Sequence, residues 1–135
     1  MALINRQTAM NDVALQKKRK NMSECIASTN AAFSTSEQDE CNEKEIAKLA
    51  KALAHPARVR IMRVLNTLHN AGGCLNSSLV SELGLAQSTV SEHLRILKEA
   101  GLITAEPNPP KVCYHINQET VHLFQELITE NLQEK

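Results

Sequence analysis

Two short apolar stripes on either side of Gly84 constrain the fold more than any other feature of this sequence. The stretch before the glycine, residues 76–83, begins with Asn-Ser-Ser, whose side chains favour helix N-caps, and then places apolar residues at helical spacing. The stretch after it, residues 87–100, has apolar side chains on one helical face: Val90, Leu94 and Leu97. Because glycine adopts the left-handed conformation at little cost, Gly84 can end the first helix in a tight turn. Two short helices joined in this way predict a helix-turn-helix.

After Gly101 the apolar residues change from the period of a helix to that of a strand. Residues 102–105 and 112–116 predict two strands, and the proline-rich segment 106–111 between them predicts a stiff loop. On the second strand one face carries Val112, Tyr114 and Ile116, and the other carries Lys111, Cys113 and His115. A hairpin directly after a helix-turn-helix predicts a winged helix.

The rest of the chain predicts helices and one polar arm. Amphipathic helices are expected from residue 42 to about 53, over residues 56–70 and from residue 118 to about 133, with the His55-Pro56 step separating the first two. Residues 1–42 predict a flexible arm with one short helix near residues 23–32. The folded domain is therefore residues 43–135, mainly α with a small antiparallel β-hairpin. The apolar stripe of the last helix is wide enough to predict a helical dimer interface.

The second helix of the helix-turn-helix carries side chains suited to DNA. Such a helix enters the major groove with its N-terminal residues at the base edges. Its outward positions are Gln87, Ser88, Thr89, Ser91, Glu92 and Arg95. Glutamine pairs with adenine, serine and threonine bond bases or phosphate, and arginine reaches guanine or the backbone. Together with Lys111 on the wing, these residues predict double-stranded DNA as a partner. His93, on the same helix, is expected in its packing or at a phosphate.

The total charge does not indicate a nucleic-acid partner, because 15 Lys+Arg balance 15 Asp+Glu. The placement of the charges is more informative. Basic residues lie on or near the helix-turn-helix and wing, with three of them expected to face solvent on the helix over residues 56–70: Arg58, Arg60 and Arg63. Four glutamates lie on the last helix. We expect modest non-specific affinity and a shallow salt dependence, so that base contacts and dimer geometry decide binding.

Three stretches, in this order, resemble the ArsR/SmtB family of bacterial winged-helix repressors. They are residues 51–65 (KALAHPARVRIMRVL), 83–97 (LGLAQSTVSEHLRIL) and 99–103 (EAGLI), and the resemblance covers about residues 43–133. It implies a homodimer, joined through its N- and C-terminal helices, that binds an inverted-repeat operator and leaves it when an inducer binds. Ala86 departs from the family, which commonly has serine as the N-cap of the recognition helix. That loss costs about 1 kcal/mol of helix stability.

Members of this family sense soft metals, metalloids, oxidants or persulfides. Their arsenic- and cadmium-type motif, Cys-Val-Cys-Asp-Leu, aligns with residues 75–79 of this chain, where both thiols are missing. The zinc-type motif of the last helix is missing as well.

A soft-metal site assembled in another way is the leading prediction. Cys74 lies next to a helix N-terminus, whose dipole lowers the pKa of a thiol. Cys25 and Cys41 lie on the arm, which in a dimer can place them over Cys74 of the other subunit. Thiolates bind trivalent arsenic or antimony and cadmium. We therefore predict a repressor that leaves its operator on binding such an arsenite-like inducer, with no cofactor required.

Three alternatives stay open. One is a thiol-redox or persulfide-responsive repressor of the same fold, which uses a pair such as Cys41 with Cys74 or with Cys113. Another is that the four cysteines are unrelated, inert thiols. The third is a dimerisation or interaction protein that does not bind DNA.

Other classes of protein are disfavoured by what the sequence lacks. It has no Cys-x-x-Cys pair, no glycine-rich phosphate loop and no paired acid-base cluster, so we do not expect an enzyme. No apolar run approaches the roughly 18 residues of a membrane span. The N-terminus has no charged and apolar regions of a secretory signal. A cytoplasmic protein with free thiols is expected.

Overall fold

The computed structural model describes residues 32–134. The chain divides into two compact units, residues 1–39 and 40–135. Of the first unit, the described part contains the start of α3 (Glu37–Leu53). The short helix predicted near residues 23–32, and Cys25 within it, lie outside the described residues.

Helix α3 begins at Glu37, five residues before the predicted start, so part of the expected arm is helical. The reason is a reciprocal cap. The amide N–H of Asp39 donates to Ser36 Oγ over 3.1 Å, and the backbone N–H of Ser36 donates to Asp39 Oδ2 over 2.9 Å. The Ser36 hydroxyl donates to the same carboxylate over 2.7 Å, and this bond, together with the one from the Ser36 backbone N–H, lowers the pKa of Asp39. The cap satisfies donors that a helix end otherwise leaves free.

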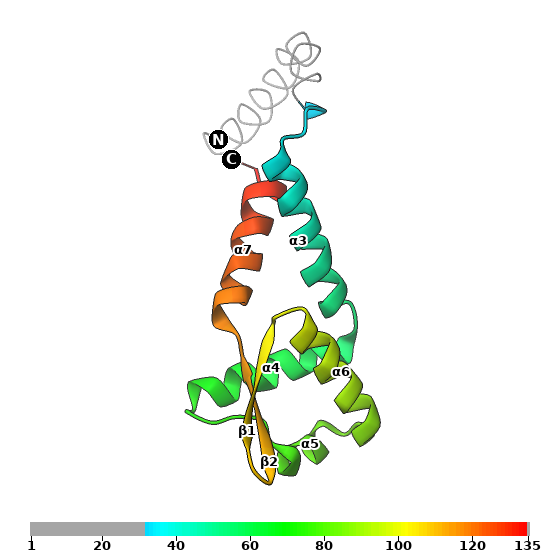
Figure 1. The fold of residues 1–135 in the computed structure, drawn as a ribbon, viewed down its shortest axis with the longest axis vertical. Coiled ribbons are helices and arrows are strands. Elements are labelled where there is room, and N and C mark those ends of the chain that lie inside the picture. Colours follow the sequence, from blue (N-terminus) through cyan, green and yellow to red (C-terminus); the bar gives the residue numbers. More distant parts are fainter. Residues whose placement is uncertain (1–31, 135) are drawn as a thin grey trace, which may run out of the picture. The chain divides into compact units, whose positions relative to one another are not determined.

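The remaining elements follow the predicted order. They are α4 (Pro56–Asn70), α5 (Ser77–Val80), the 3₁₀-helix η1 (Ser81–Leu83), α6 (Gln87–Glu99), β1 (Ile103–Asn108), β2 (Lys111–Ile116) and α7 (Gln118–Leu132) (Figure 1). The unit that starts at residue 40 is therefore mainly helical with one two-stranded antiparallel sheet. None of the helices between residues 32 and 134 is long and apolar enough to cross a bilayer.

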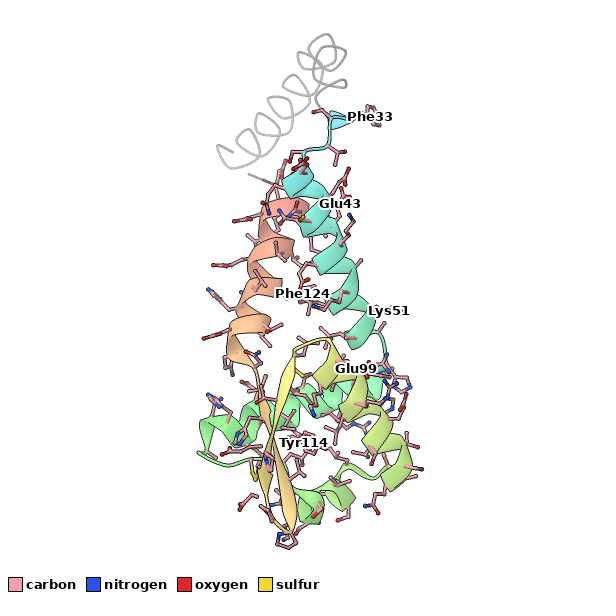
Figure 2. All side chains as sticks on the ribbon, in the orientation of Figure 1. Phe33, Glu43, Lys51, Glu99, Tyr114 and Phe124 are labelled. Carbon is pink, nitrogen blue, oxygen red and sulfur yellow. A yellow bond between two sulfur atoms is a disulfide. The ribbon has the colours of Figure 1, made fainter. Side chains whose placement is uncertain are left out.

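The core is aliphatic and collects side chains from every part of the winged helix. Its fully buried members come from α3, α4, α6, the segment before α5 and the start of the hairpin: Leu49, Ile61, Leu65, Leu75, Val90, Leu97, Leu102 and Ile103. On α7, Phe124 and Val121 pack against this cluster (Figure 2). Helix α7 also exposes Leu123 (41% exposed) and Leu132 (71%), which leaves apolar surface for the predicted dimer interface.

The turn between the two short helices has the predicted chemistry. The Asn76 side chain caps α5 by accepting from the amide N–H of Ser78 over 3.0 Å. Gly84 ends η1 with φ of 67°, a left-handed conformation that glycine adopts without strain. Ala86 takes the extended backbone of an N-cap residue but makes no side-chain hydrogen bond to α6. The recognition helix therefore starts uncapped, as the sequence predicts.

The wing is longer than predicted, because β1 continues through Pro107 to Asn108 where a loop was expected. Pro107 lies opposite Val112, and Asn108 opposite Lys111, so the turn is only Pro109-Pro110. A strand of a two-stranded sheet has one unpaired edge, which tolerates the missing N–H of proline. On the other side of β2, Leu75 and Tyr114 exchange two backbone hydrogen bonds of 3.0 and 2.8 Å (Figure 2 labels Tyr114). The wing is thus held against the segment that leads into α5.

Candidate DNA-binding surface and cysteine pair

Helix α6 presents the predicted DNA-contacting residues on one exposed face. Its opposite face is buried through Val90, His93, Leu94 and Leu97. Because a helix repeats every 3.6 residues, burial of these four leaves the intervening positions outside. All six predicted residues are exposed: Gln87, Ser88, Thr89, Ser91, Glu92 and Arg95. The surface has the location that base contacts require, and the contacts themselves stay a prediction.

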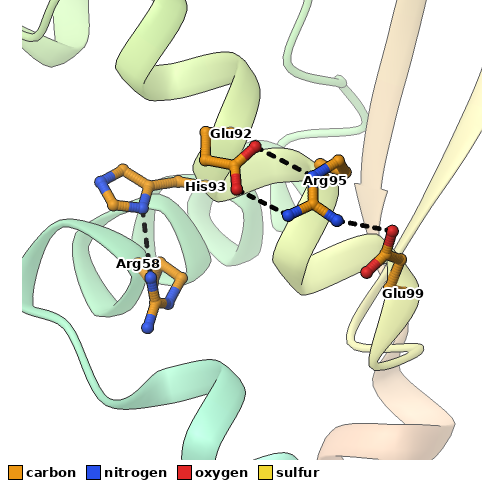
Figure 3. A network of polar contacts seen from close by, with 5 residues as sticks. All are labelled: Arg58, Glu92, His93, Arg95 and Glu99. Carbon is orange, nitrogen blue, oxygen red and sulfur yellow. Dashed lines mark hydrogen bonds and ion pairs between the residues drawn. The ribbon is translucent and has the colours of Figure 1, made fainter.

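Arg95 is held by two carboxylates of its own helix (Figure 3). Its Nε and Nη2 donate to Glu92 over 2.9 and 2.6 Å, and its Nη1 donates to Glu99 over 2.7 Å. The hydrogen bonds from Arg95 lower the pKa of Glu92, and both carboxylates raise the pKa of Arg95. The guanidinium therefore stays charged, and each of its three nitrogens donates one hydrogen bond in the absence of DNA. Because a guanidinium has five N–H donors, it can contact a base or phosphate through another N–H or by exchanging one of these pairs.

The buried side of α6 contains a polar cluster that sequence reasoning identified only in part. The sequence predicts that His93 either packs under the helix or contacts a phosphate, and its 7% exposure agrees with packing. Its Nδ1 lies 3.3 Å from Arg58 Nη1, and its ring centroid lies 4.5 Å from that of His55. Arg58 was expected in solvent and is instead half-buried, with hydrogen bonds to the end of α3. That expectation was wrong because the apolar stripe of α4 identifies only the face that packs on the hydrophobic core. Arg58 lies outside that stripe but contacts both α3 and α6.

The burial of His93 lowers its pKa, and Coulombic interactions with the nearby His55 and Arg58 side chains lower it further. The imidazole is therefore neutral at neutral pH. His55 has a second role as the N-cap of α4, where its Nδ1 accepts from the amide N–H of Ala57 over 3.0 Å. This confirms the expectation that His55 is a helix-junction residue.

The wing cation Lys111 is directed back to the helix-turn-helix. Its Nζ donates to Ser78 Oγ over 2.8 Å, which joins the start of β2 to α5. Both side chains are exposed, so solvent and phosphate can compete for the ammonium group. Its DNA contact stays a prediction, and the structure gives the partner that such a contact displaces.

Cys74 and Cys113 form a disulfide across the same junction. Their Cα atoms are 5.5 Å apart, within the usual range for such a bond. The paired backbones of Leu75 and Tyr114, the next residues in each chain segment, bring the two cysteines together. The sequence identified both residues as redox candidates but named Cys41 as the partner of either one. The pairing depends on a contact between segments 39 residues apart.

The predicted soft-metal site of Cys25, Cys41 and Cys74 is not assembled in the described part of the chain. Cys41 is an exposed free thiol on α3, Cys74 is bonded to Cys113, and Cys25 lies outside the described residues. Between residues 32 and 134 no group of three or more His, Cys, Asp or Glu side chains could hold a metal ion. His115, the second ligand type on the wing, lies 3.3 Å from the Glu106 carboxylate across the hairpin. The three-cysteine site stays a prediction.

Comparison with known proteins places these features in one family. A model described as "Bacterial regulatory protein, arsR family" matches residues 55–105, which span α4 to β1. The transcriptional regulator CmtR of Mycobacterium tuberculosis is 39% identical over 75 residues, covering 56% of this chain and 60% of that protein. The biofilm growth-associated repressor of Xylella fastidiosa is 31% identical over 84 residues, covering 62% of this chain and 70% of the repressor.

Solved structures agree with the sequence matches. Reduced HlyU from Vibrio cholerae superposes with a TM-score of 0.54 at 28% identity, covering 73% of this chain and all of HlyU. The chain spans less than two thirds of CmtR, and the residues that match the family model, 55–105, contain the helix-turn-helix.

Proposed function

Because the chain belongs to the ArsR family of bacterial regulatory proteins, we propose that it is a DNA-binding transcriptional repressor whose operator affinity depends on the redox state of Cys74 and Cys113. The observation that carries the proposal is the disulfide between these residues, which joins the wing to the segment before the helix-turn-helix. Its relatives are transcriptional regulators and not enzymes.

In the DNA complex, α6 enters the major groove and the wing lies along the backbone. A homodimer formed through α3 and α7 places two copies of α6 on an inverted repeat, about one helical turn apart. The exposed apolar residues of α7, Leu123 and Leu132, support this arrangement because they lack a partner in the described part of one chain. The bases are contacted from the start of α6, where glutamine, serine and threonine side chains are exposed.

Oxidation opposes DNA binding in this account. The disulfide and the Lys111–Ser78 hydrogen bond together hold the wing against α5. With the bond reduced, the wing keeps the Leu75–Tyr114 pairing and regains freedom to adjust to the groove, so Lys111 can contact phosphate. With hydrogen peroxide as the oxidant, two thiols lose two protons and two electrons to form the S–S bond, and the peroxide is reduced to two molecules of water.

A soft metal or metalloid inducer is the second candidate. Reduction of the bond leaves two half-buried thiols side by side, and trivalent arsenic, antimony or cadmium binds paired thiolates. The same two sulfurs would then respond to a metalloid in place of an oxidant, with Cys41 or Cys25 as a further ligand. The redox function is preferred because the described residues bring two sulfurs together and no third ligand.

The test is operator binding by the full chain, measured by fluorescence anisotropy with duplexes tiled across the region upstream of its own gene. We expect the reduced protein to bind one inverted repeat and to release it after hydrogen peroxide, with binding restored by dithiothreitol. Under oxygen-free reducing conditions, release by arsenite or cadmium would instead support the second candidate.

Two variants make the result specific. Cys74→Ser and Cys113→Ser should bind like the reduced wild type and ignore peroxide, whereas Cys41→Ser should behave as wild type. Absence of specific binding to any tiled duplex at low salt would exclude the repressor function. Peroxide release that persists in Cys113→Ser would exclude the proposed cysteine pair.

A further inference from the structure

Arg58 links three helices at the buried side of α6. From α4 its Nε donates to the Ala52 carbonyl over 2.5 Å, and its Nη2 donates to the Lys51 carbonyl over 3.4 Å. Both carbonyls belong to the last turn of α3, where a helix leaves carbonyls without α-helical partners, and the Lys51 carbonyl also accepts from the Ala54 N–H over 3.3 Å. The third nitrogen, Nη1, reaches His93 Nδ1 on α6 over 3.3 Å (Figure 3). One planar guanidinium therefore contacts the end of α3 and the inner face of α6.

Arg58 also lies beside a surface groove between α3 and α6. The groove has a volume of about 460 Å³ and is lined by Lys48, Lys51 and Ala52 from α3, by Ile96 and Glu99 from α6, and by Arg58. Leu49 of α3 and Leu97 of α6 belong to the same hydrophobic core, and Arg58 adds a polar link between the two helices.

Burial of His93 costs more free energy than burial of an apolar side chain at the same position would. His93 is 7% exposed, and its Nε2 is buried with no hydrogen-bond partner among the described residues. A leucine or methionine would fill the same space without a buried polar atom. To accept from Arg58, Nδ1 must be unprotonated, which places the ring proton on the unpartnered Nε2. The contact with Arg58 is what an imidazole provides at this position and an apolar side chain does not.

We propose that Arg58 is a positioning residue that fixes the DNA-reading helix α6 against the end of α3 through His93. The inference rests on the proposed DNA-binding function and adds the residue that couples the two helices. His93 lies between Ser91 and Arg95 in sequence, so a shift or rotation of α6 about this contact moves the exposed face as a unit. A change in α3 is transmitted to α6 through two backbone carbonyls, one guanidinium and one imidazole.

The link depends on a neutral imidazole. When His93 gains a proton, both ring nitrogens become donors, and the ring no longer accepts from Arg58. The charged and titratable groups that act on it are His55, the N-cap of α4, Arg58 on α4 and Glu92 beside it on α6. Of these, His55 and Arg58 oppose protonation and Glu92 favours it.

The test compares Arg58→Met with Arg58→Lys and with Lys44→Met, a control that removes one exposed cation from α3. Each variant is first checked for folding by circular dichroism and thermal melting. Amide hydrogen exchange of the DNA-free protein then reports on α6. We expect Arg58→Met to accelerate exchange in α6 and Arg58→Lys to restore part of the protection, with Lys44→Met as wild type. Unchanged α6 exchange in a folded Arg58→Met protein would overturn the proposal, whether or not the chain binds an operator.

Operator binding supplies the second readout. Arg58→Met should lower affinity for the operator by about tenfold while its affinity for a random duplex stays near that of Lys44→Met. Equal losses on both duplexes would show a general effect and contradict positioning.

If Arg58→Met does not fold, operator affinity is measured across a pH series in wild type and in the His93→Gln variant instead. Glutamine accepts from Arg58 but does not titrate, so specific affinity should fall on acidification in wild type and in His122→Gln, and stay level in His93→Gln. The same pH profile in all three proteins would overturn the proposal.

Discussion

The Lys111 ammonium group at the start of β2 donates a hydrogen bond to the Ser78 hydroxyl on α5 over 2.8 Å. The wing and the helix-turn-helix are therefore joined at an exposed polar contact as well as at the Cys74–Cys113 bond. A phosphate can replace the hydroxyl without loss of a buried interaction, since both partners already face solvent.

Replacement of Lys111 by glutamine should weaken binding to operator and random duplexes to a similar extent. A lysine on phosphate contributes counterion release and no base recognition, so the slope of log K against log salt should become shallower by about one. The measurement is a salt titration of the reduced protein. Ser78→Ala is the matched control and should keep the wild-type slope. An unchanged slope in Lys111→Gln would show that the wing cation does not contact phosphate.

Glu92→Gln should raise affinity for a random duplex by roughly two- to fivefold. Glu92 accepts from two of the three Arg95 nitrogens and adds a negative charge to the exposed face of α6. The Arg95 hydrogen bonds lower the pKa of Glu92, so the carboxylate is charged at neutral pH. Glu99→Gln removes the same charge from the far end of the helix and should have the smaller effect. The reverse order would show that Arg95 is not limited by Glu92.

Ala86→Ser should stabilise the fold by about 1 kcal/mol. Ala86 already has φ of −60° and ψ of 139°, the extended backbone of an N-cap, and lacks only the side-chain acceptor. Asn76→Ala is the opposite change at α5, because it removes the side chain that accepts from the Ser78 N–H over 3.0 Å. It should lower the free energy of unfolding by a similar amount. Urea unfolding of the two variants checks both signs. An unchanged free energy of unfolding in Ala86→Ser would mean that solvent already satisfies the first amide groups of α6.

The stability of the fold should fall on acidification because of His93. Its pKa in the folded state is lowered from 6.5, so the folded protein binds this proton more weakly than the unfolded chain. The contribution is therefore complete above pH 6.5 and is lost as the pH falls from 6.5 through the lowered folded-state pKa. Urea unfolding between pH 5 and 8 should show a steeper decline for wild type than for His93→Gln. Parallel declines in the two proteins would assign the effect to other groups.

Most of the fold was predictable because its helices are amphipathic and Gly84 marks the turn between two of them. The start of α3 was missed because Ser36 and Asp39 cap it in a polar segment without an apolar stripe. The length of β1 was missed because Pro107 reads as a loop residue, although an edge strand accepts it.

The candidate site was predictable where helical spacing decides it. The exposed face of α6 followed from periodicity, and the spacing of Glu92, Arg95 and Glu99 is that of helical ion pairs. The contacts of Arg58 with His93 and of Cys74 with Cys113 join residues 35 and 39 positions apart. They depend on tertiary packing between segments, which periodicity within one segment does not report.

The most direct test follows the disulfide and the operator in the same samples. The reduced protein is equilibrated in a series of dithiothreitol redox buffers, the fraction of Cys74–Cys113 disulfide is measured by mass spectrometry after alkylation, and operator binding is measured by anisotropy. The account predicts that loss of operator binding follows disulfide formation with the same midpoint, and that Cys113→Ser binds throughout. Full operator binding by protein in which the Cys74–Cys113 bond is complete would contradict it.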